Sequence, residues 1–433
     1  MTKGPLLIDD CFLHDKDRLR HDEALVLLRD RLACIVGTET IAASDAAERI
    51  LAEPILAPHP IPLHRNAAVD GYAYNHGDSI DIALPVSNRI AAGSLNPPRL
   101  EAGTAARIFT GAPMPDGADT VAMQEDCTAD GDTVVLPQGL KIGANCRQAG
   151  EDLQPGDLVV PAGQCLKPAD LAALASIGRA NLVVYKKLRL ALFSSGDEMR
   201  DPGDHAAAHT LQPGEVYDAN QPLIAALSRH LPVSIDRLGI IADDADAVQS
   251  ALSDAAARYD VIITTGGASR GAEDHMVSTL DRLGKRHLWQ LAVKPGRPMI
   301  FGQLDREAND GEIAHCLYFG LPGNPVAAMV CFLLYAQPAL LKLAGANWSA
   351  PARYQIPARF DITKKKPDRR EFLRGKLKLD SNGTTTVDKF SRDGSGLISS
   401  LRESDGFIEI EESVTSLKAG ELVSFIPFTS FLP

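Results

Sequence analysis

The sequence contains few cysteines and no paired ones: seven are scattered through 433 residues without a C-x-x-C motif. This pattern excludes a disulfide framework and a cysteine-based zinc site, and it is typical of reduced thiols. The longest uncharged apolar run, 326–336, is too short to cross a bilayer. Residues 1–20 lack an apolar core of signal-peptide length. We therefore expect a cytoplasmic protein.

Positive charge is also scarce, since the net charge is -12 and the pI about 5.4. Such a balance argues against nucleic acid or an anionic membrane as the main partner, so any anion site must be built locally. The composition, with 45% hydrophobic and 23% charged residues, suits a globular protein. A chain of 433 residues is long enough for about three domains.

The N-terminal part combines helical and β patterns. Apolar residues at helical spacing predict a first helix, with Asp22 as N-cap and Gly37 as its end, and a second short helix after Ser44. From 57 to 157, turn signals separate short hydrophobic runs, which indicates an all-β segment. Because a helical pattern returns at 167–178, the β segment is predicted to be an insertion into a small helical framework.

Strands and helices alternate from about 186 to 345, which predicts a doubly wound α/β sheet. The last part is again β, with an Asn-Gly hairpin at 376–390. We thus predict a multidomain α/β plus β protein with a β-barrel-like C-terminal domain. The predicted domains are the framework (38–56 and 158–179), the inserted β domain (57–157), the α/β domain (17–37 and 180–346) and the C-terminal β domain (347–433).

Four strand-to-helix turns of the α/β segment share glycine, proline and polar residues: 194–198, 242–245, 264–271 and 320–325. Each alone is compatible with an ordinary tight turn, but in a parallel sheet all lie at the carboxyl edge, where ligands bind. Glycines there let amides at helix starts approach an anion. The glycines concerned are Gly266, Gly267, Gly320 and Gly323. No Walker A or G-x-G-x-x-G motif is present, which argues against an ordinary ATPase or Rossmann dehydrogenase.

Charged side chains are predicted at the same edge. Lys294 and Arg297 flank a Pro-Gly turn, and carboxylates with cations suit a Mg²⁺ that bridges to phosphate. Helix N-caps are the alternative for Asp218, Asp243 and Asp244. His205 and His209 have a metal-compatible spacing, but prolines and glycines flank them, so we interpret them as a solvated loop. The carboxylates are Asp197, Glu198, Asp218, Asp243 and Asp274.

Three loops of the β insertion, 66–73, 109–115 and 149–153, each combine small residues with one reactive side chain. These side chains are Asp70, Thr110 and Asp152. An Asp-Gly pair is usually only a turn, so residue chemistry alone assigns them no role.

Seven motifs in a fixed order, spread over nearly the whole chain, resemble the molybdopterin molybdenumtransferase family of MoeA and gephyrin E-domain type. They are NAAVDGYA, FTGAPMP, AGEDL, LFSSGDE, TTGGAS, KPGRP and GLPGNP. The resemblance implies an α/β domain that binds molybdopterin and a homodimer of four-domain protomers whose active sites are shared between protomers. It implies that molybdate is inserted into adenylylated molybdopterin with Mg²⁺, which releases AMP and forms molybdenum cofactor.

The resemblance also implies roles for individual residues. The catalytic positions are Asp70, Thr110, Asp152, Glu198 and Lys294, and the Mg²⁺ ligands are Glu198, Asp243 and Asp274. The substrate-binding positions are Gly266, Gly267, Ser269, Asp274, Arg297, Pro322, Gly323, Asn324 and Pro325.

The chain departs from the family pattern at three positions. Val69 stands where methionine is frequent, and Gln290 stands where lysine is common. Arg297 replaces a second lysine but keeps the charge and can bind phosphate. Gln290 removes a positive charge, so the role of that position stays open.

Two other functions fit parts of the pattern. A molybdopterin adenylyltransferase shares a similar α/β domain but does not need the β insertion or the terminal β domain. A gephyrin-like scaffold can lose Asp70 or Lys294, which this chain keeps. Tungstate remains an alternative oxyanion. Molybdopterin adenylyltransferase and molybdoenzyme maturation proteins are candidate partners.

Overall fold

The computed structural model describes residues 18–78, 83–203, 211–266, 275–307 and 313–432. The chain divides into two compact units. The first contains the residues before Glu53, residues 163–167 and everything from Leu182 onward. The second contains Glu53–Ala162 and Pro168–Asn181.

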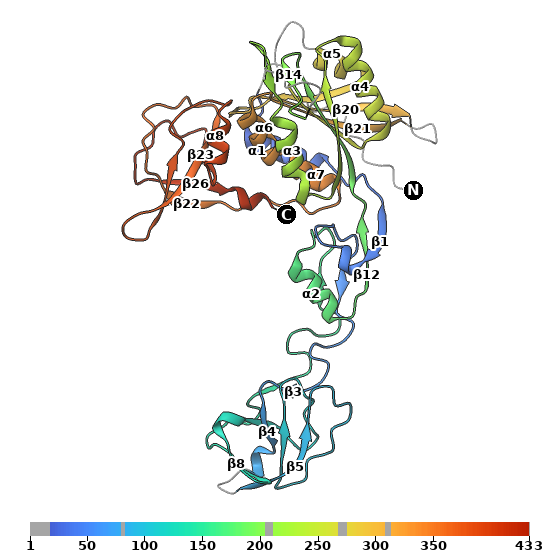
Figure 1. Cartoon of the computed structure of the whole chain (residues 1–433), viewed down its shortest axis with the longest axis vertical. Helices are drawn as coiled ribbons and strands as arrows, with labels where there is room; N and C mark the ends of the chain where they lie inside the picture. Colours follow the sequence, from blue (N-terminus) through green and yellow to red (C-terminus); the bar gives the residue numbers. More distant parts are fainter. Residues whose placement is uncertain (1–17, 79–82, 204–210, 267–274, 308–312, 433) are drawn as a thin grey trace. The chain divides into compact units, whose positions relative to one another are not determined.

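A six-stranded sheet lies at the centre of the first unit, in the order β16-β13-β17-β21-β20-β18 (Figure 1). Neighbours among β16, β13, β17 and β21 are parallel, as predicted, whereas β20 and β18 pair antiparallel. The sequence pattern does not predict this antiparallel edge. Its strands follow one another without a crossover helix, so parallel pairing is not available to them. The strands are β13 (Leu188–Ser195), β16 (Val233–Ile241), β17 (Val261–Thr265), β18 (Gly284–Gln290), β20 (Pro298–Glu307) and β21 (Ile313–Leu321).

Helices cover both faces of this sheet, because successive residues of each strand point to opposite sides. Leu190 and Leu192 belong to one core cluster with α1, α3, α6 and α7, while Ala191 and Phe193 pack with α4 and α5. The sheet is therefore doubly wound, as predicted. The helices are α1 (His21–Arg31), α3 (Asn220–Leu227), α4 (Ala245–Arg258), α5 (His275–Leu283), α6 (Pro325–Cys331) and α7 (Gln337–Leu343).

The helix that begins at Pro325 continues to Leu343 through a π-helical segment, Phe332–Ala336. This stretch is longer than the uncharged run at 326–336, and by length and composition it is able to cross a membrane. However, 83% of its apolar window is buried inside the protein. The helix is therefore a buried helix of the protein core.

The C-terminal β domain shares the first unit's core through Phe372, Phe407 and Ile426. Its sheet has the order β19-β23-β25-β26-β22, and β24 pairs with β23 through the predicted Asn-Gly hairpin. β19 pairs with β23 in parallel, which sets Lys294 opposite Glu371. The elements are β19 (Val293–Lys294), β22 (Tyr354–Pro357), β23 (Arg370–Leu379), β24 (Thr385–Lys389), α8 (Ile398–Arg402), β25 (Gly406–Ile410) and β26 (Leu422–Pro427).

The second unit is built on another six-stranded sheet, in the order β7-β4-β6-β5-β9-β8. As predicted, the described part of 57–157 contains no α-helix. The strands are β4 (Gly71–Tyr74), β5 (Leu84–Ile90), β6 (Ala105–Ile108), β7 (Thr120–Met123), β8 (Thr128–Asp130) and β9 (Thr133–Val135). Short pairs β2 (Ile55–Leu56) with β11 (Leu158–Val160) and β3 (Asn66–Ala67) with β10 (Cys146–Arg147) accompany it, and α2 spans Pro168–Ser176.

Two predictions near the N-terminus are wrong. The N-cap of α1 is Arg20, whose backbone N–H donates to the Glu23 carboxylate at 2.9 Å, and the helix ends at Arg31 rather than Gly37. No second α-helix follows Ser44; the chain forms β1 (Thr38–Ala42) and a single 3₁₀ turn, Ala43–Asp45. β1 pairs with β12 (Asn181–Tyr185), so long-range strand pairing overrides the local helical preference.

Asp22 instead joins a charge network between α1 and the C-terminal β domain. Arg370 donates to Asp22 at 2.9 and 3.0 Å and to the buried Glu409 at 3.0 Å. Beside it, the buried His21 shares a 2.7 Å hydrogen bond between Nδ1 and the Tyr335 hydroxyl. Burial lowers the pKa of His21 to about 4; Arg370 and Arg353 add to the shift, while Glu409 and Asp22 oppose it.

This shift predicts a loss of stability in acid. Because the unfolded chain protonates His21 below its ordinary pKa of 6.5 and the folded protein does not until about pH 4, stability falls between these values. His21→Asn removes the effect. The difference in unfolding free energy between the wild type and His21→Asn should therefore be about 3 kcal/mol smaller at pH 4 than at pH 7. Denaturant titration at both pH values measures it. A difference that is equal at both pH values contradicts this prediction.

Candidate functional site

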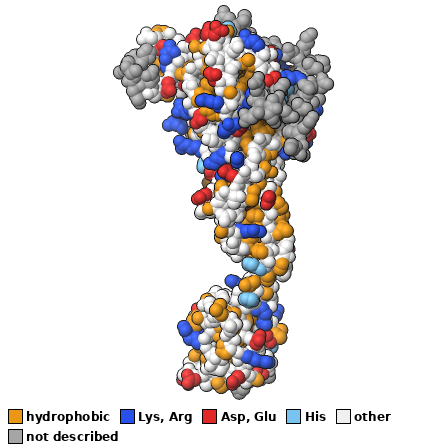
Figure 2. All heavy atoms as spheres, turned by 90° about the vertical axis from the view of Figure 1, so that its right-hand side faces the viewer, with side chains coloured by type: hydrophobic (Ala, Val, Ile, Leu, Met, Phe, Trp, Pro, Cys, Tyr) orange, Lys and Arg blue, Asp and Glu red, His pale blue; other side chains and the backbone are white. Residues whose placement is uncertain are grey.

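Basic and acidic side chains are interspersed on the coloured face in Figure 2, so surface charge there does not reveal an anion site. A cavity of about 420 Å³ in the first unit, by contrast, gathers cationic side chains. Five cationic side chains and one carboxylate line it: Arg18, Lys294, Arg297, Arg369, Arg374 and Asp393. Pro322 and Asn324 also line it, so the structure brings four predicted site residues together in a basic cavity.

Lys294 owes its position to the pairing of β19 with β23. Its ammonium lies 3.5 Å from the Glu371 carboxylate, and its side chain is 43% exposed. Arg369 contacts the other oxygen of the same carboxylate at 3.0 Å. One buried carboxylate thus holds two cations of the cavity, and the exposure of Lys294 leaves it accessible to a ligand.

Gln290 and Arg297, the two departures from the family pattern in this region, are hydrogen-bonded to each other. The Gln290 side-chain oxygen accepts long hydrogen bonds from Arg297 Nε at 3.4 Å and Nη2 at 3.3 Å. A lysine at position 290 would instead place a second positive charge beside the guanidinium. The glutamine therefore orients Arg297 and does not compete with it for an anion.

Arg374 has a structural role in the same cavity, because it holds a neighbouring loop. Its buried guanidinium donates to the carbonyls of Arg392 and Gly394 at 3.1 and 3.2 Å, which holds the loop that ends at Ser395. The Ser395 carbonyl in turn accepts from the Val326 N–H at 3.0 Å. This corrects the expectation that the amides at this helix start face a ligand: Pro325 has no N–H, and the amide of Val326 is occupied by protein.

The carboxyl edge of the sheet meets the cavity at the 320–325 loop. Gly266 packs closely enough that a Cβ would clash with the Ser195 carbonyl, and a Cβ at Gly323 would lie 3.6 Å from the Gly266 Cα. The Gly266 N–H donates to the Leu321 carbonyl at 3.1 Å. Gly320 lies within β21, against Ile300 and Tyr318. Gly266 and Gly320 therefore serve close packing of strand ends, whereas a Cβ at Gly323 would make only an ordinary contact, and the expectation of a free amide at Gly266 is wrong.

The predicted carboxylates have different tasks. Asp244 caps α4 by accepting from the amides of Asp246 and Ala247, as the N-cap alternative predicts. Asp218 is buried and is not the N-cap of α3, which is Ala219; its carboxylate accepts from Asn220 N at 2.9 Å and from Ser194 Oγ at 2.6 Å, and so joins the start of α3 to β13. Asp243 is exposed, and its backbone N–H donates to Asp197 Oδ1 at 2.9 Å.

Glu198 is also exposed, and its carboxylate lies against Gly196, where a Cβ would clash with it. The Asp197–Asp243 hydrogen bond places the two exposed carboxylates, Glu198 and Asp243, on adjacent turns. Among the described residues, no three His, Cys, Asp or Glu side chains are grouped as a metal site. The predicted third ligand, Asp274, lies outside the described residues, as do Gly267, Ser269, His205 and His209.

In the second unit, Asp70 and Thr110 form a pair. Asp70 Oδ1 accepts from both the backbone N–H and the hydroxyl of Thr110, each at 2.7 Å. These two hydrogen bonds lower the pKa of Asp70. The nearby Arg107 lowers it further, whereas partial burial of the carboxylate opposes the shift. The carboxylate is therefore ionised and held in one orientation. Asp152 is exposed, and no hydrogen bond of its side chain to the pair is found among the described residues.

Four arginines near the candidate site residues were not predicted from the sequence: Arg18, Arg369 and Arg374 of the cavity, and Arg107 of the second unit. Arg369 lies in a basic stretch, residues 364–376, which contains seven lysines and arginines and was the available signal. Arg107 contacts the loops of Asp70 and Thr110, but a single arginine within a short strand gives no signal.

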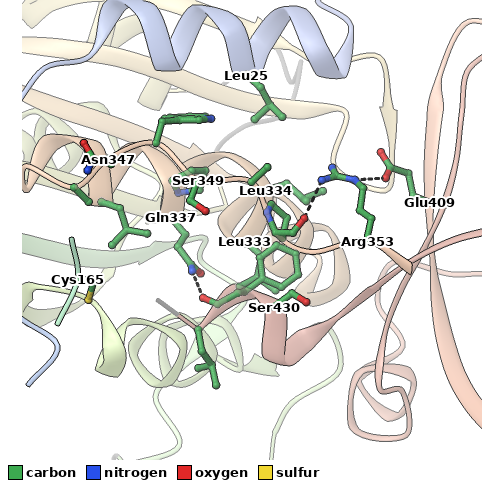
Figure 3. Close-up of a pocket in the computed structure, with 18 of the residues that line it drawn as sticks. Leu25, Cys165, Leu333, Leu334, Gln337, Asn347, Ser349, Arg353, Glu409 and Ser430 are labelled. Atoms are coloured by element: carbon green, nitrogen blue, oxygen red, sulfur yellow. Dashed lines mark hydrogen bonds and ion pairs between the residues drawn. The ribbon is translucent and has the colours of Figure 1, made fainter. Parts of the chain in front are cut away.

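A larger cavity of about 860 Å³ lies elsewhere in the first unit, and no predicted site residue lines its described part. Figure 3 shows Leu333, Leu334 and Gln337 along it and Arg353 paired with Glu409. The motifs therefore favour the smaller, basic cavity.

Three family models match the chain in order. They describe the MoeA N-terminal region (domain I and II) over residues 19–178, a probable molybdopterin binding domain over 191–342, and the MoeA C-terminal region (domain IV) over 355–428.

Known proteins match over nearly the full length. The molybdopterin molybdenumtransferase of Haemophilus influenzae is 34% identical over 414 residues, covering 95% of this chain and 99% of the relative. That of Staphylococcus aureus (strain COL) is 30% identical over 395 residues, covering 89% and 90%. The crystal structure of the MoeA molybdopterin biosynthesis protein from Pyrococcus horikoshii aligns over 95% of this chain and 100% of that chain, with 26% identity and a TM-score of 0.78.

Proposed function

This chain belongs to the molybdopterin molybdenumtransferase family, and on that premise we propose how its residues insert molybdate into adenylylated molybdopterin, releasing AMP and forming molybdenum cofactor. The observation that carries the assignment of the site is the basic cavity. It gathers Lys294, Arg297 and Arg369 in a chain whose net charge is -12. Both substrates are anionic, and molybdate is a tetrahedral dianion.

The cavity residues bind and orient the anions. Lys294 supplies a compact charge, whereas Arg297 and Arg369 supply planar donors suited to phosphate-like oxygens. The Asn324 side chain adds a neutral polar group. As the bond between AMP and the pterin phosphate breaks, negative charge grows on the leaving group, and fixed cations stabilise it.

Asp70 supplies a fixed negative charge and a proton acceptor. The two bonds from Thr110 occupy Oδ1, and no hydrogen bond to Oδ2 is found among the described residues. Oδ2 is thus the oxygen that accepts a proton from a reacting water or thiol. Thr110 fixes the carboxylate while this happens, and no covalent bond between protein and substrate is needed.

The described residues fit Mg²⁺ at the carboxyl edge. Mg²⁺ is typically held by one or two carboxylates together with substrate phosphates and waters, so a cluster of three protein ligands is not required. Glu198 and Asp243, exposed on adjacent turns, are the residues that would hold it. When bound, the metal neutralises charge on the phosphate oxygens.

We also propose a homodimer in the cytoplasm, with each site shared between protomers. Six described cysteines are free thiols, which suits a reducing compartment. The match to the family's N-terminal and C-terminal regions argues against the adenylyltransferase alternative, which needs neither the β insertion nor the terminal β domain.

Reconstitution tests the function. The full-length protein is incubated with adenylylated molybdopterin, Mg²⁺ and either molybdate or tungstate, and released AMP is measured. We expect oxyanion-dependent release of AMP. Pyrophosphate release from ATP with molybdopterin, without AMP release from the adenylylated form, would instead identify an adenylyltransferase. A comparison of the two oxyanions decides which one the enzyme prefers.

Lys294 is predicted to matter more for binding than Gln290. Lys294→Ala should weaken binding of adenylylated molybdopterin by about 1.5 to 3 kcal/mol, the range for charge-assisted hydrogen bonds. Gln290→Ala should cost less, because the glutamine contacts Arg297 rather than supplying charge. Calorimetry on both variants measures the difference. Equal losses would mean that Gln290 contacts the substrate directly.

A further inference from the structure

Arg107 contacts the surroundings of both Asp70 and Thr110. Its Nη1 donates to the Gly71 carbonyl at 2.8 Å, and its Nη2 donates to the Gln124 side-chain oxygen. Its guanidinium lies over the Phe109 ring, 4.7 Å from the centroid. Gly71 follows Asp70 in the chain, and Phe109 precedes Thr110. One half-buried side chain thus contacts the residues next to both members of the pair.

A third segment is joined through the same guanidinium. The backbone N–H of Gln124 donates to the Asp70 carbonyl at 3.0 Å, so the partner of Nη2 is itself attached to Asp70. Strand register adds a further contact: Tyr72 lies opposite Arg107 across the β4–β6 pair, and the guanidinium is 5.1 Å from its ring centroid.

The backbone after Asp70 has little freedom of its own. Gly71 packs so closely on β7 that a Cβ would clash with the Ala122 carbonyl. Its own carbonyl, however, is held by the Arg107 side chain. A contact that spans 36 residues of sequence thus holds the backbone carbonyl next to Asp70.

We propose that Arg107 is a positioning residue, which holds the Asp70 and Thr110 loops together so that the carboxylate is aligned for reaction. This inference rests on the proposed function of the pair. It goes beyond that function because the role assigned to Arg107 is exerted through Asp70. The guanidinium charge also contributes to the lowered pKa of Asp70, after the two Thr110 hydrogen bonds.

The chain offers a matched control in Arg89. Its guanidinium lies over the same Phe109 ring, also at 4.7 Å, but among the described residues it makes no hydrogen bond to the Asp70 or Thr110 loops. If Arg107 only packs on an aromatic ring, replacing Arg107 and replacing Arg89 should have the same effect. If Arg107 positions Asp70, only its replacement should affect the Asp70–Thr110 pair.

The first experiment needs no substrate. Hydrogen exchange of the Thr110 amide, which donates to Asp70 Oδ1, is followed by NMR or mass spectrometry in the full-length protein. We expect about tenfold faster exchange in Arg107→Gln, as for the loss of one net hydrogen bond, and no change in Arg89→Gln. Unchanged exchange in Arg107→Gln, or equal acceleration in both variants, would overturn the proposal whether or not the protein proves to be a molybdenumtransferase.

The second experiment measures AMP release with the same variants at several pH values. Arg107→Gln should lower kcat by about 10- to 100-fold with little change in KM, and it should move the acid limb of the pH profile upward. Arg107→Lys restores the position of that limb, because it restores the charge. A loss confined to KM, or an equal loss in Arg89→Gln, would contradict a positioning role. Absence of AMP release in the wild type would count against the proposed function alone.

Discussion

Mixing two variants that each have little activity alone is expected to restore about a quarter of wild-type activity. Asp70 lies in the second unit and Lys294 in the first. The proposed homodimer combines the second unit of one protomer with the first unit of its partner in each active site. Asp70→Ala and Lys294→Ala, assayed at a substrate concentration low enough that the weakened binding leaves Lys294→Ala with little activity, would then complement one another in a mixed dimer. One site of that dimer carries both substitutions, and the other carries neither.

The magnitude follows from symmetry. Random exchange makes about half of the dimers mixed, and each mixed dimer has one intact site of two, which gives about a quarter of wild-type AMP release. If each site were built within one chain, every site in the mixture would carry one substitution. Subunit exchange is checked by mass spectrometry of differently tagged chains. No recovery despite confirmed exchange would rule out the shared site.

Removal of Mg²⁺ is expected to reduce AMP release at least about 1,000-fold, since a metal bound to phosphate oxygens contributes several kcal/mol to charge stabilisation. The assay measures AMP release in excess chelator and again after Mg²⁺ is restored. Unchanged turnover in chelator would show that the cations of the cavity suffice.

Adjacent carboxylates supply the control for this prediction. Asp243 is exposed, and no hydrogen bond of its carboxylate is found among the described residues, whereas the Asp244 carboxylate caps α4. Asp243→Asn should raise the Mg²⁺ concentration that gives half-maximal AMP release. Asp244→Asn should leave it unchanged, because asparagine caps a helix about as well as aspartate. An equal response of the two variants would assign the metal to other ligands.

Elements whose signals are local could be predicted from the sequence alone. Alternating strand and helix patterns predicted the parallel part of the central sheet, Asn382-Gly383 predicted the hairpin of β23 and β24, and Asp244 was one of three aspartates offered as a helix cap. Each depends on residues a few positions apart, whose periodicity or turn chemistry acts before any distant contact forms. The ordered motifs added the family and the residues to examine.

Which side chains act together became clear only from the folded structure. Lys294 and Glu371 are 77 residues apart, and His21 and Tyr335 are 314 apart, so neither pairing leaves a pattern in a sequence window. Gln290 became interpretable only beside Arg297, and Arg107 only once β4 and β6 placed it between the Asp70 and Thr110 loops. The amide of Val326 was expected to face a ligand but donates to Ser395, because a distant loop packs on that helix start. Such contacts depend on how whole elements pack, and local propensity carries no information about that packing.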